Sequence, residues 1–123
     1  MLQMTDYAQF CKTWLDAWTG NKPAALVVFY SDDAFYSDPA KPVGLNGKTE
    51  ILKYFEKLLS KNPDWKWEVV EIFPTEKGFT LKWKATIPTN ETSLTICGLD
   101  IVEMRDDLIS RNEVYFDRTA WIK

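Results

Sequence analysis

Hydrophobic and polar residues follow two different periods along this chain. In the first half, apolar side chains recur every three or four residues, which is typical of amphipathic helices. Beyond Pro63 the pattern changes to alternation, which is typical of strands with one buried face. The two patterns predict helices in the first twenty residues, in 23–30 and in 48–61, and strands at 65–73, 78–87, 92–105 and 108–117.

Turn-forming residues separate these segments. The letters "SDD" at 31–33 predict a turn, and residues 34–38 predict a short extended piece. Their Pro and Gly content makes 40–47 a predicted loop, and two aspartates at 106–107 predict a tight turn between the last two strands. Helices followed by hairpin-linked strands indicate an α+β fold, in which helices pack on one face of a curved antiparallel sheet and form a cone-shaped pocket.

The strand at 92–105 raises a chemical question, because Asp100 lies in its centre. Counting by twos, Asp100 shares a face with the apolar residues Leu94, Ile96 and Val102. An isolated buried carboxylate is costly, so it must be paired, hydrogen-bonded, protonated or exposed to a cavity. The alternative is a bulge at Gly98, which would turn the carboxylate to solvent.

Composition narrows the possible chemistry. The 123 residues are expected to form a single domain, 1–123. Seven Phe, six Trp and five Tyr indicate either a dense core or an aromatic-walled pocket. The chain has no histidine, so a Ser-His-Asp triad is excluded and a zinc site is not expected. Any general acid or base must be a carboxylate, Tyr, Lys or Cys. The net charge of −3, without a basic stripe, predicts no nucleic-acid partner.

The same sequence predicts a cytoplasmic protein with no membrane partner. The N-terminus has no basic region followed by a long apolar one, so no signal peptide is expected. The longest apolar run, "AALVVFY", is too short to cross a bilayer. Cys11 and Cys97 are expected to be free thiols in a reducing compartment.

A second carboxylate, Asp38 in "FYSDPA", is a candidate partner for Asp100. Two carboxylates in one apolar cavity have pKa values that desolvation raises and mutual repulsion separates. One of them can then stay ionised as a base while the other stays protonated as a donor. The alternative interpretation is structural, because an aspartate before a proline often caps a turn through its own backbone.

The run "FYSDDAFYSDPAKPVGLNGKTEI" resembles steroid delta-isomerases, which belong to the superfamily with the nuclear transport factor 2 fold. The ending "EVYFDRTAW" is similar to limonene epoxide hydrolases and to SnoaL-like relatives of polyketide cyclases. The resemblance implies that Asp38 is a general base, that Asp100 is a protonated donor and that Asp117 is a third acidic group. Trp14 stands where the isomerases carry a tyrosine.

The resemblance implies a small-molecule isomerase or cyclase that needs neither cofactor nor metal. Its carboxylates would transfer a proton next to a carbonyl group of an apolar, cyclic metabolite. The alternative is a non-catalytic module for ligand binding or dimerisation, and a homodimer through the sheet is expected. The predicted pocket walls are the aromatic residues Trp14, Trp18, Tyr30, Tyr54, Phe55, Trp67, Trp83 and Tyr115.

Overall fold

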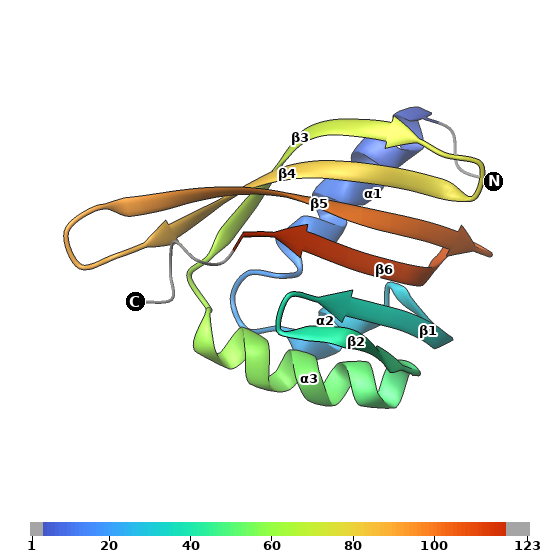
Figure 1. The fold of residues 1–123 in the computed structure, drawn as a ribbon, viewed down its shortest axis with the longest axis horizontal. Coiled ribbons are helices and arrows are strands. Elements are labelled where there is room, and N and C mark those ends of the chain that lie inside the picture. The colour runs from blue at the N-terminus through green and yellow to red at the C-terminus, as the bar shows by residue number, and fades with distance from the viewer. Residues whose placement is uncertain (1–3, 118–123) are drawn as a thin grey trace.

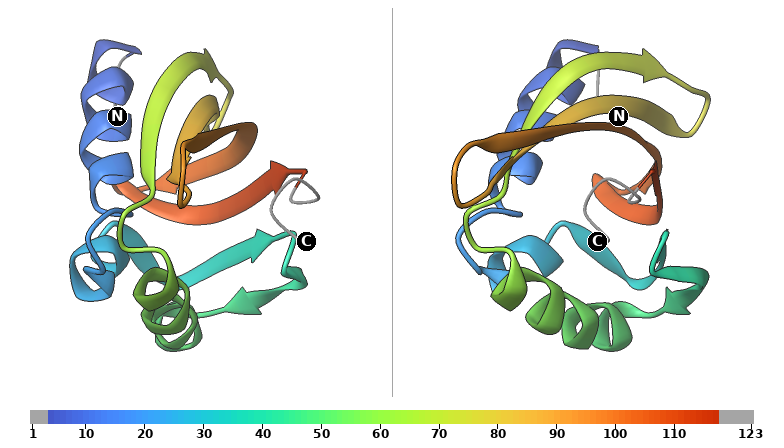
Figure 2. Two further views of the ribbon diagram at one scale, coloured as in Figure 1. Left: turned by 90° about the vertical axis from the view of Figure 1, so that its left-hand side faces the viewer. Right: turned by 60° about the vertical axis from the view of Figure 1, so that its left-hand side comes forward.

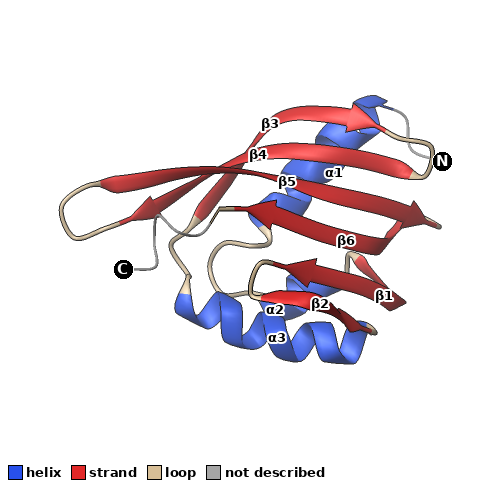
Figure 3. Cartoon of the chain, viewed as in Figure 1, coloured by secondary structure: helices blue, strands red, loops and turns tan. Residues whose placement is uncertain are grey.

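A computed structural model describes residues 4–117 as three helices and a six-stranded sheet (Figures 1 and 3). The helices are α1 (Met4–Asp16), α2 (Pro23–Val27) and α3 (Lys48–Lys61). The strands are β1 (Tyr30–Asp38), β2 (Lys41–Asn46), β3 (Lys66–Pro74), β4 (Gly78–Pro88), β5 (Ser93–Arg105) and β6 (Leu108–Phe116), and they lie side by side in the order β2-β1-β6-β5-β4-β3.

The predicted fold class is confirmed, with one difference in the sheet. Strands β3 to β6 form an antiparallel meander, as the alternating second half of the sequence predicts. Strand β1, however, pairs with β6 in parallel, so the sheet is mixed. This pairing joins two strands that are far apart in the sequence, and no local sequence pattern reports a contact between such distant segments.

Two predictions about the segment after α2 are wrong. The "SDD" letters at 31–33 lie inside β1, where Asp32 and Asp33 are exposed, and do not form a turn. Residues 40–47, expected to be a loop, contain β2. This strand forms the edge of the sheet, where Pro42 is tolerated because no neighbour beyond it needs its missing N–H.

The sheet curls around its inner face, and the helices lie along one side of it (Figure 2). Helix α1 contacts β3, whereas α3 contacts α2 and β1. The core between these layers is strongly aromatic, because Trp14, Tyr30 and Phe55 are fully buried in it. None of the described helices has the length and apolar character that a membrane span would require.

Strand β5 has the face that its sequence pattern predicts. Ile96, Asp100 and Val102 are buried, and Cys97 and Leu99 between them are exposed. The β4–β5 register is regular, with Trp83 opposite Gly98, so the alternative of a bulge at Gly98 is wrong. The turn at 106–107 forms as predicted, with both residues at positive φ.

Candidate functional site

A cavity of about 220 Å³ opens on the inner face of the curved sheet. Its walls come from α1, α3 and five of the strands, and they are mostly apolar and aromatic. Asp38 and Asp100 both line this cavity, with only 8% and 4% of their surfaces exposed. The two carboxylates that the sequence singles out therefore share one nearly dry compartment.

Asp100 is held by two N–H donors, one for each carboxylate oxygen. The indole Nε1 of Trp83 donates to Oδ1 at 2.7 Å, and Nδ2 of Asn112 donates to Oδ2 at 3.0 Å. Burial, together with the charge of Asp38, raises the pKa of Asp100 from 3.8 to about 6, although the two donors act to lower it. Asp100 therefore changes its protonation state close to neutral pH.

Behind Asp100, the hydrogen bonds continue into the core. The Tyr30 hydroxyl donates to Oδ1 of Asn112 at 2.8 Å, which fixes the amide so that its Nδ2 faces Asp100. Burial and the charge of Asp100 raise the pKa of Tyr30 well above its ordinary value, so this phenol stays neutral. The Trp14 indole nitrogen is also buried here, near the Tyr30 side chain.

Asp38 accepts four hydrogen bonds. Its Oδ1 caps the β1–β2 turn, because the backbone N–H groups of Ala40 and Lys41 each donate to it at 2.9 Å. Its Oδ2 accepts the hydroxyls of Tyr36 at 2.8 Å and Tyr54 at 2.6 Å. A carboxylate offers about four lone-pair directions, so this one is saturated by the protein itself. The turn-capping interpretation of Asp38 therefore describes one of its oxygens, and the other accepts from two tyrosines that line the cavity.

The raised pKa of Asp100 makes stability depend on pH. Protonated Asp100 favours the folded state, so its contribution is complete below about pH 4 and is lost as pH rises through about 6. We expect the free energy of unfolding of the wild type, measured relative to Asp100→Asn by urea denaturation, to fall by up to about 3 kcal/mol between about pH 4 and 7. If the difference in free energy of unfolding between wild type and Asp100→Asn does not depend on pH, this prediction is contradicted.

Gly98 makes room for the Trp83 indole. A Cβ at position 98 would lie 2.3 Å from Cζ2 of Trp83, so Gly98→Ala must displace the ring that donates to Asp100. We expect this variant to lose about 1–3 kcal/mol of stability in urea denaturation. In a Trp83→Leu background the same change should cost far less, and an equal cost in both backgrounds would rule out the steric explanation.

The structure separates the predicted pocket residues into those that line the cavity, those in the core, and one, Tyr115, on the outer surface. Trp18, Tyr54, Trp67 and Trp83 line the cavity. Trp14, Tyr30 and Phe55 lie in the core and do not line it, although Tyr30 supports Asn112.

Tyr115 and Asp117 complete the comparison. Tyr115 is 52% exposed, does not line the cavity, and donates its hydroxyl to Oε1 of Glu113 at 2.7 Å. Asp117 follows the end of β6 in an exposed position and does not line the cavity either. The alternation that placed Asp100 inside places Tyr115 outside, because Tyr115 pairs with the outward residue Leu99.

The sequence analysis missed Tyr36 and Asn112, which contact the two carboxylates directly. The period of two along a strand could have indicated both residues. Tyr36 lies two positions before Asp38, and Asn112 lies two positions before the cavity residue Val114, so each shares a face with a cavity residue. The other lining residues that were missed are Leu15, Ala40, Leu58, Asn62, Trp65, Ala85, Ile87, Ile96, Val114 and Phe116.

Within residues 4–117, no cluster of acidic or sulfur side chains has the arrangement of a metal site.

Comparison with known proteins places this geometry among related folds. The sequence profile of the SnoaL-like domain matches residues 11–112. No curated protein sequence matches the chain significantly. A solved protein from Catenulispora acidiphila with a ketosteroid isomerase-like fold, in complex with trimethylamine, superimposes with a TM-score of 0.76 at 18% identity, covering 89% of this chain and 85% of its own.

Two further solved structures have the same architecture. AclR, a candidate hydroxylase from Streptomyces galilaeus, gives a TM-score of 0.75 at 16% identity over 95% of this chain and 92% of its own. A candidate SnoaL-like polyketide cyclase from Shewanella putrefaciens gives 0.74 at 12% identity over 89% and 78%. At such identities the likeness concerns the fold alone.

Proposed function

Because the chain belongs to the family of SnoaL-like domains, we propose that it is a small isomerase or cyclase that transfers a proton next to a carbonyl group of a cyclic metabolite. The observation that carries the proposal is Asp100, a buried carboxylate at the wall of an aromatic cavity that titrates at about 6. A general acid or base works best when its pKa lies near the operating pH. The likeness to a candidate polyketide cyclase supports the class of reaction.

Asp100 is the proton-transfer group in this proposal. Each of its oxygens accepts one N–H, from Trp83 or Asn112, and keeps capacity for a second contact with a ligand. In its ionised form it removes a proton from the carbon beside the carbonyl, and it returns that proton to another position of the same ligand. Burial among apolar walls keeps water away from the intermediate.

Asp38 supports the reaction as a fixed hydrogen-bond acceptor. The resemblance to steroid delta-isomerases assigns the base to Asp38, but its four donors would have to release it before it could accept a proton. It instead orients the hydroxyls of Tyr36 and Tyr54 at the cavity wall, and either one could turn toward a ligand oxygen. Asp117 has no role in this proposal.

The size of the cavity restricts the substrate. Pockets that hold drug-sized ligands have volumes of about 300–1,000 Å³, and this cavity has about 220 Å³. A steroid-sized substrate therefore fits poorly, and the proposal favours a ligand with one small ring.

Solvent deuterium exchange tests the proposal without knowledge of the product. The protein is incubated in D₂O with a panel of small cyclic ketones, and mass spectrometry follows deuterium at the carbon beside the carbonyl. We expect incorporation in at least one ketone well above the rate with heat-denatured protein. Exchange at the background rate with every ketone that binds would contradict proton transfer.

A non-catalytic ligand-binding module is the second candidate. It is favoured by the fact that both carboxylates already have partners within the protein, as recognition groups in a rigid pocket would. The Catenulispora protein of similar fold holds trimethylamine, which supports binding of a small ligand in this architecture. The exchange experiment separates the two candidates, because a module would bind a ligand and leave its hydrogens unexchanged.

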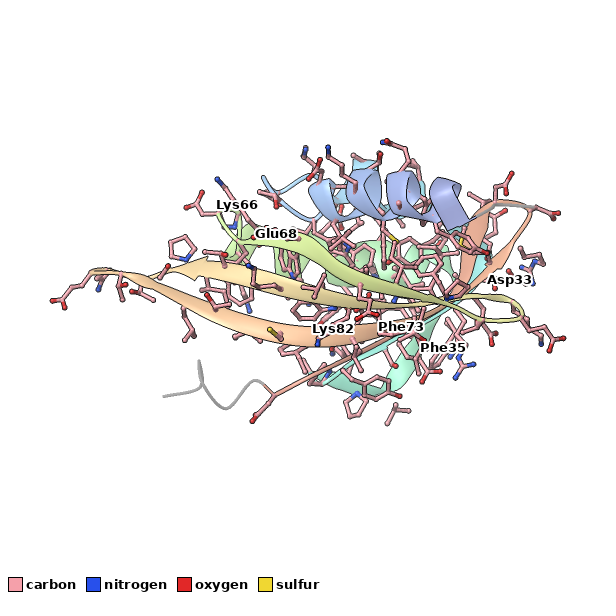
Figure 4. All side chains as sticks on the ribbon, turned by 90° about the horizontal axis from the view of Figure 1, so that it is seen from above. Asp33, Phe35, Lys66, Glu68, Phe73 and Lys82 are labelled. Atoms are coloured by element: carbon pink, nitrogen blue, oxygen red, sulfur yellow. The ribbon has the colours of Figure 1, made fainter. Side chains whose placement is uncertain are left out.

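The expected homodimer remains a prediction, as does the cytoplasmic location. Phe73 and Leu99 form a shallow apolar groove on the outer face of the sheet, with Tyr115 paired to Leu99, and a second copy would cover them. Figure 4 shows Phe73 and Lys82 on the side of the sheet turned away from α1. We expect sedimentation velocity to show a dimer that Leu99→Glu dissociates, and a wild-type monomer at high concentration would contradict it.

A further inference from the structure

The charge of the cavity wall has one sign. Its two charged side chains are Asp38 and Asp100, and no Lys or Arg lines the cavity within residues 4–117. Neither carboxylate has a hydrogen bond from a cationic side chain in that part of the chain, since their donors are phenols, backbone amides, an indole and an amide. Two acidic groups thus face a small apolar volume with no counter-charge at its wall.

Part of the wall is a continuous series of five aromatic rings. Trp65 and Trp67 have centroids 6.1 Å apart, and Trp67 and Trp18 also 6.1 Å. Trp18 and Tyr36 follow at 6.3 Å, then Tyr36 and Tyr54 at 5.8 Å. Each ring is tilted against the next, by 48°, 51°, 34° and 45° along the series. The rings therefore do not form a flat stack.

Aromatic rings and carboxylates together attract a particular kind of ligand. The face of a tryptophan or tyrosine ring carries negative potential and attracts cations, and this attraction grows when the cation leaves water. A neutral ligand can be buried here and can accept hydrogen bonds, but it supplies no counter-charge to the two hydrogen-bonded carboxylates. We propose that the cavity binds a small organic ammonium ion, with its alkyl groups against the rings and its charge near Asp100. This goes beyond the proposed function, because such binding needs no proton transfer.

The groups around Asp100 are consistent with this charge preference. Cys11 from α1 faces it, and burial raises the pKa of that thiol to about 12, so it stays neutral. Tyr30 and Asp38 face it from β1, and Trp83 and Asn112 donate to it from β4 and β6. None of these groups carries a positive charge that a cationic ligand would have to displace.

Among the residues that the structure describes, Lys41 places its ammonium group over one of the rings. Its Nζ lies over the Tyr54 ring, 5.7 Å from the centroid, and the residue is exposed and does not line the cavity. It therefore reaches this ring without filling the cavity. A ligand cation would occupy the interior beside Trp18 and Trp67.

A charged ligand and its uncharged isostere test the proposal. Calorimetric titrations of the wild type at about pH 8 compare choline with 3,3-dimethylbutan-1-ol, in which carbon replaces the quaternary nitrogen, at constant ionic strength. We expect choline to bind at least about tenfold more tightly, the factor that about 1.4 kcal/mol supplies. Choline affinity should also fall as pH is lowered through about 6, where Asp100 takes up a proton. Equal affinities, or no choline binding, would overturn the proposal.

Two variants and a control locate the site. Asp100→Asn should weaken choline binding about tenfold or more and leave the alcohol unaffected, while Asp32→Asn, an equal charge change at an exposed position of β1, should change neither. Trp67→Leu should weaken choline more than the alcohol, which keeps the test open if Asp100→Asn fails to fold. Undiminished choline binding by both Asp100→Asn and Trp67→Leu would refute the site. The deuterium-exchange experiment tests proton transfer and does not depend on choline binding, so the proposed function and the proposed ammonium site can each fail without the other.

Discussion

Asp38→Ala is expected to lower the free energy of unfolding by about 2–4 kcal/mol, because it removes one acceptor from four donors. The turn amides of Ala40 and Lys41 would lose their cap, and the hydroxyls of Tyr36 and Tyr54 would lose their common partner in a nearly dry cavity. Loss of a capping side chain alone typically costs about 1 kcal/mol. Urea denaturation at neutral pH measures the change.

Asp38→Asn is the matched control for this prediction. Its amide oxygen can still accept from both turn amides, and its NH₂ group can donate to phenol oxygens that rotate their own protons away. We expect it to cost about 1 kcal/mol, clearly less than alanine. If asparagine and alanine are equally destabilising, the buried charge and not the hydrogen-bond network supplies the stability.

The largest expected effect on activity is that of Asp100→Asn. Once a ketone that exchanges deuterium is known, this variant should lose about 10²–10⁴-fold of the exchange rate, the range that a positioned general base contributes. The wild-type rate should rise as pH increases through about 6 and then level off, because the ionised form of Asp100 is the base. The rates are measured by mass spectrometry on folded protein, checked by circular dichroism.

Asp38→Asn distinguishes the two possible assignments of the base. If Asp38 only orients Tyr36 and Tyr54, its asparagine variant should keep most of the exchange rate and the pH midpoint near 6. If Asp38 is the base, as the resemblance to steroid delta-isomerases implies, Asp38→Asn should lose the rate and Asp100→Asn should shift the profile. If Asp38→Asn and Asp100→Asn both keep the wild-type exchange rate, catalysis by either carboxylate is excluded.

The inward position of Asp100 could be predicted because a strand has a period of two, and the buried neighbours Ile96 and Val102 fix its phase. The hydrogen bond from Trp83 could not, since it depends on the register that puts Gly98 opposite that residue. Local pattern determines which face a side chain occupies, whereas partners across strands require the tertiary structure.

The first half of the sheet was harder to predict for a related reason. Strand β2 is a short edge strand that contains Pro42 and Gly44, so its local composition resembles a loop. Strand β1 starts with two buried residues and continues with two exposed aspartates, so its composition resembles a turn. Its pairing with β6 places Asp38 near Asp100, and only the complete fold brings those two segments together.

The missing side chain at Gly98 has a consequence for evolution. Because the Trp83 indole fills the space where a Cβ would stand, Gly98 is not free to change while the tryptophan remains. Homologues that carry alanine or anything larger at the position of Gly98 should have exchanged the tryptophan for a smaller residue, and should have found another donor for the acid. These two sites should therefore covary across the lineage, and the substitution of the tryptophan should precede or accompany that of the glycine.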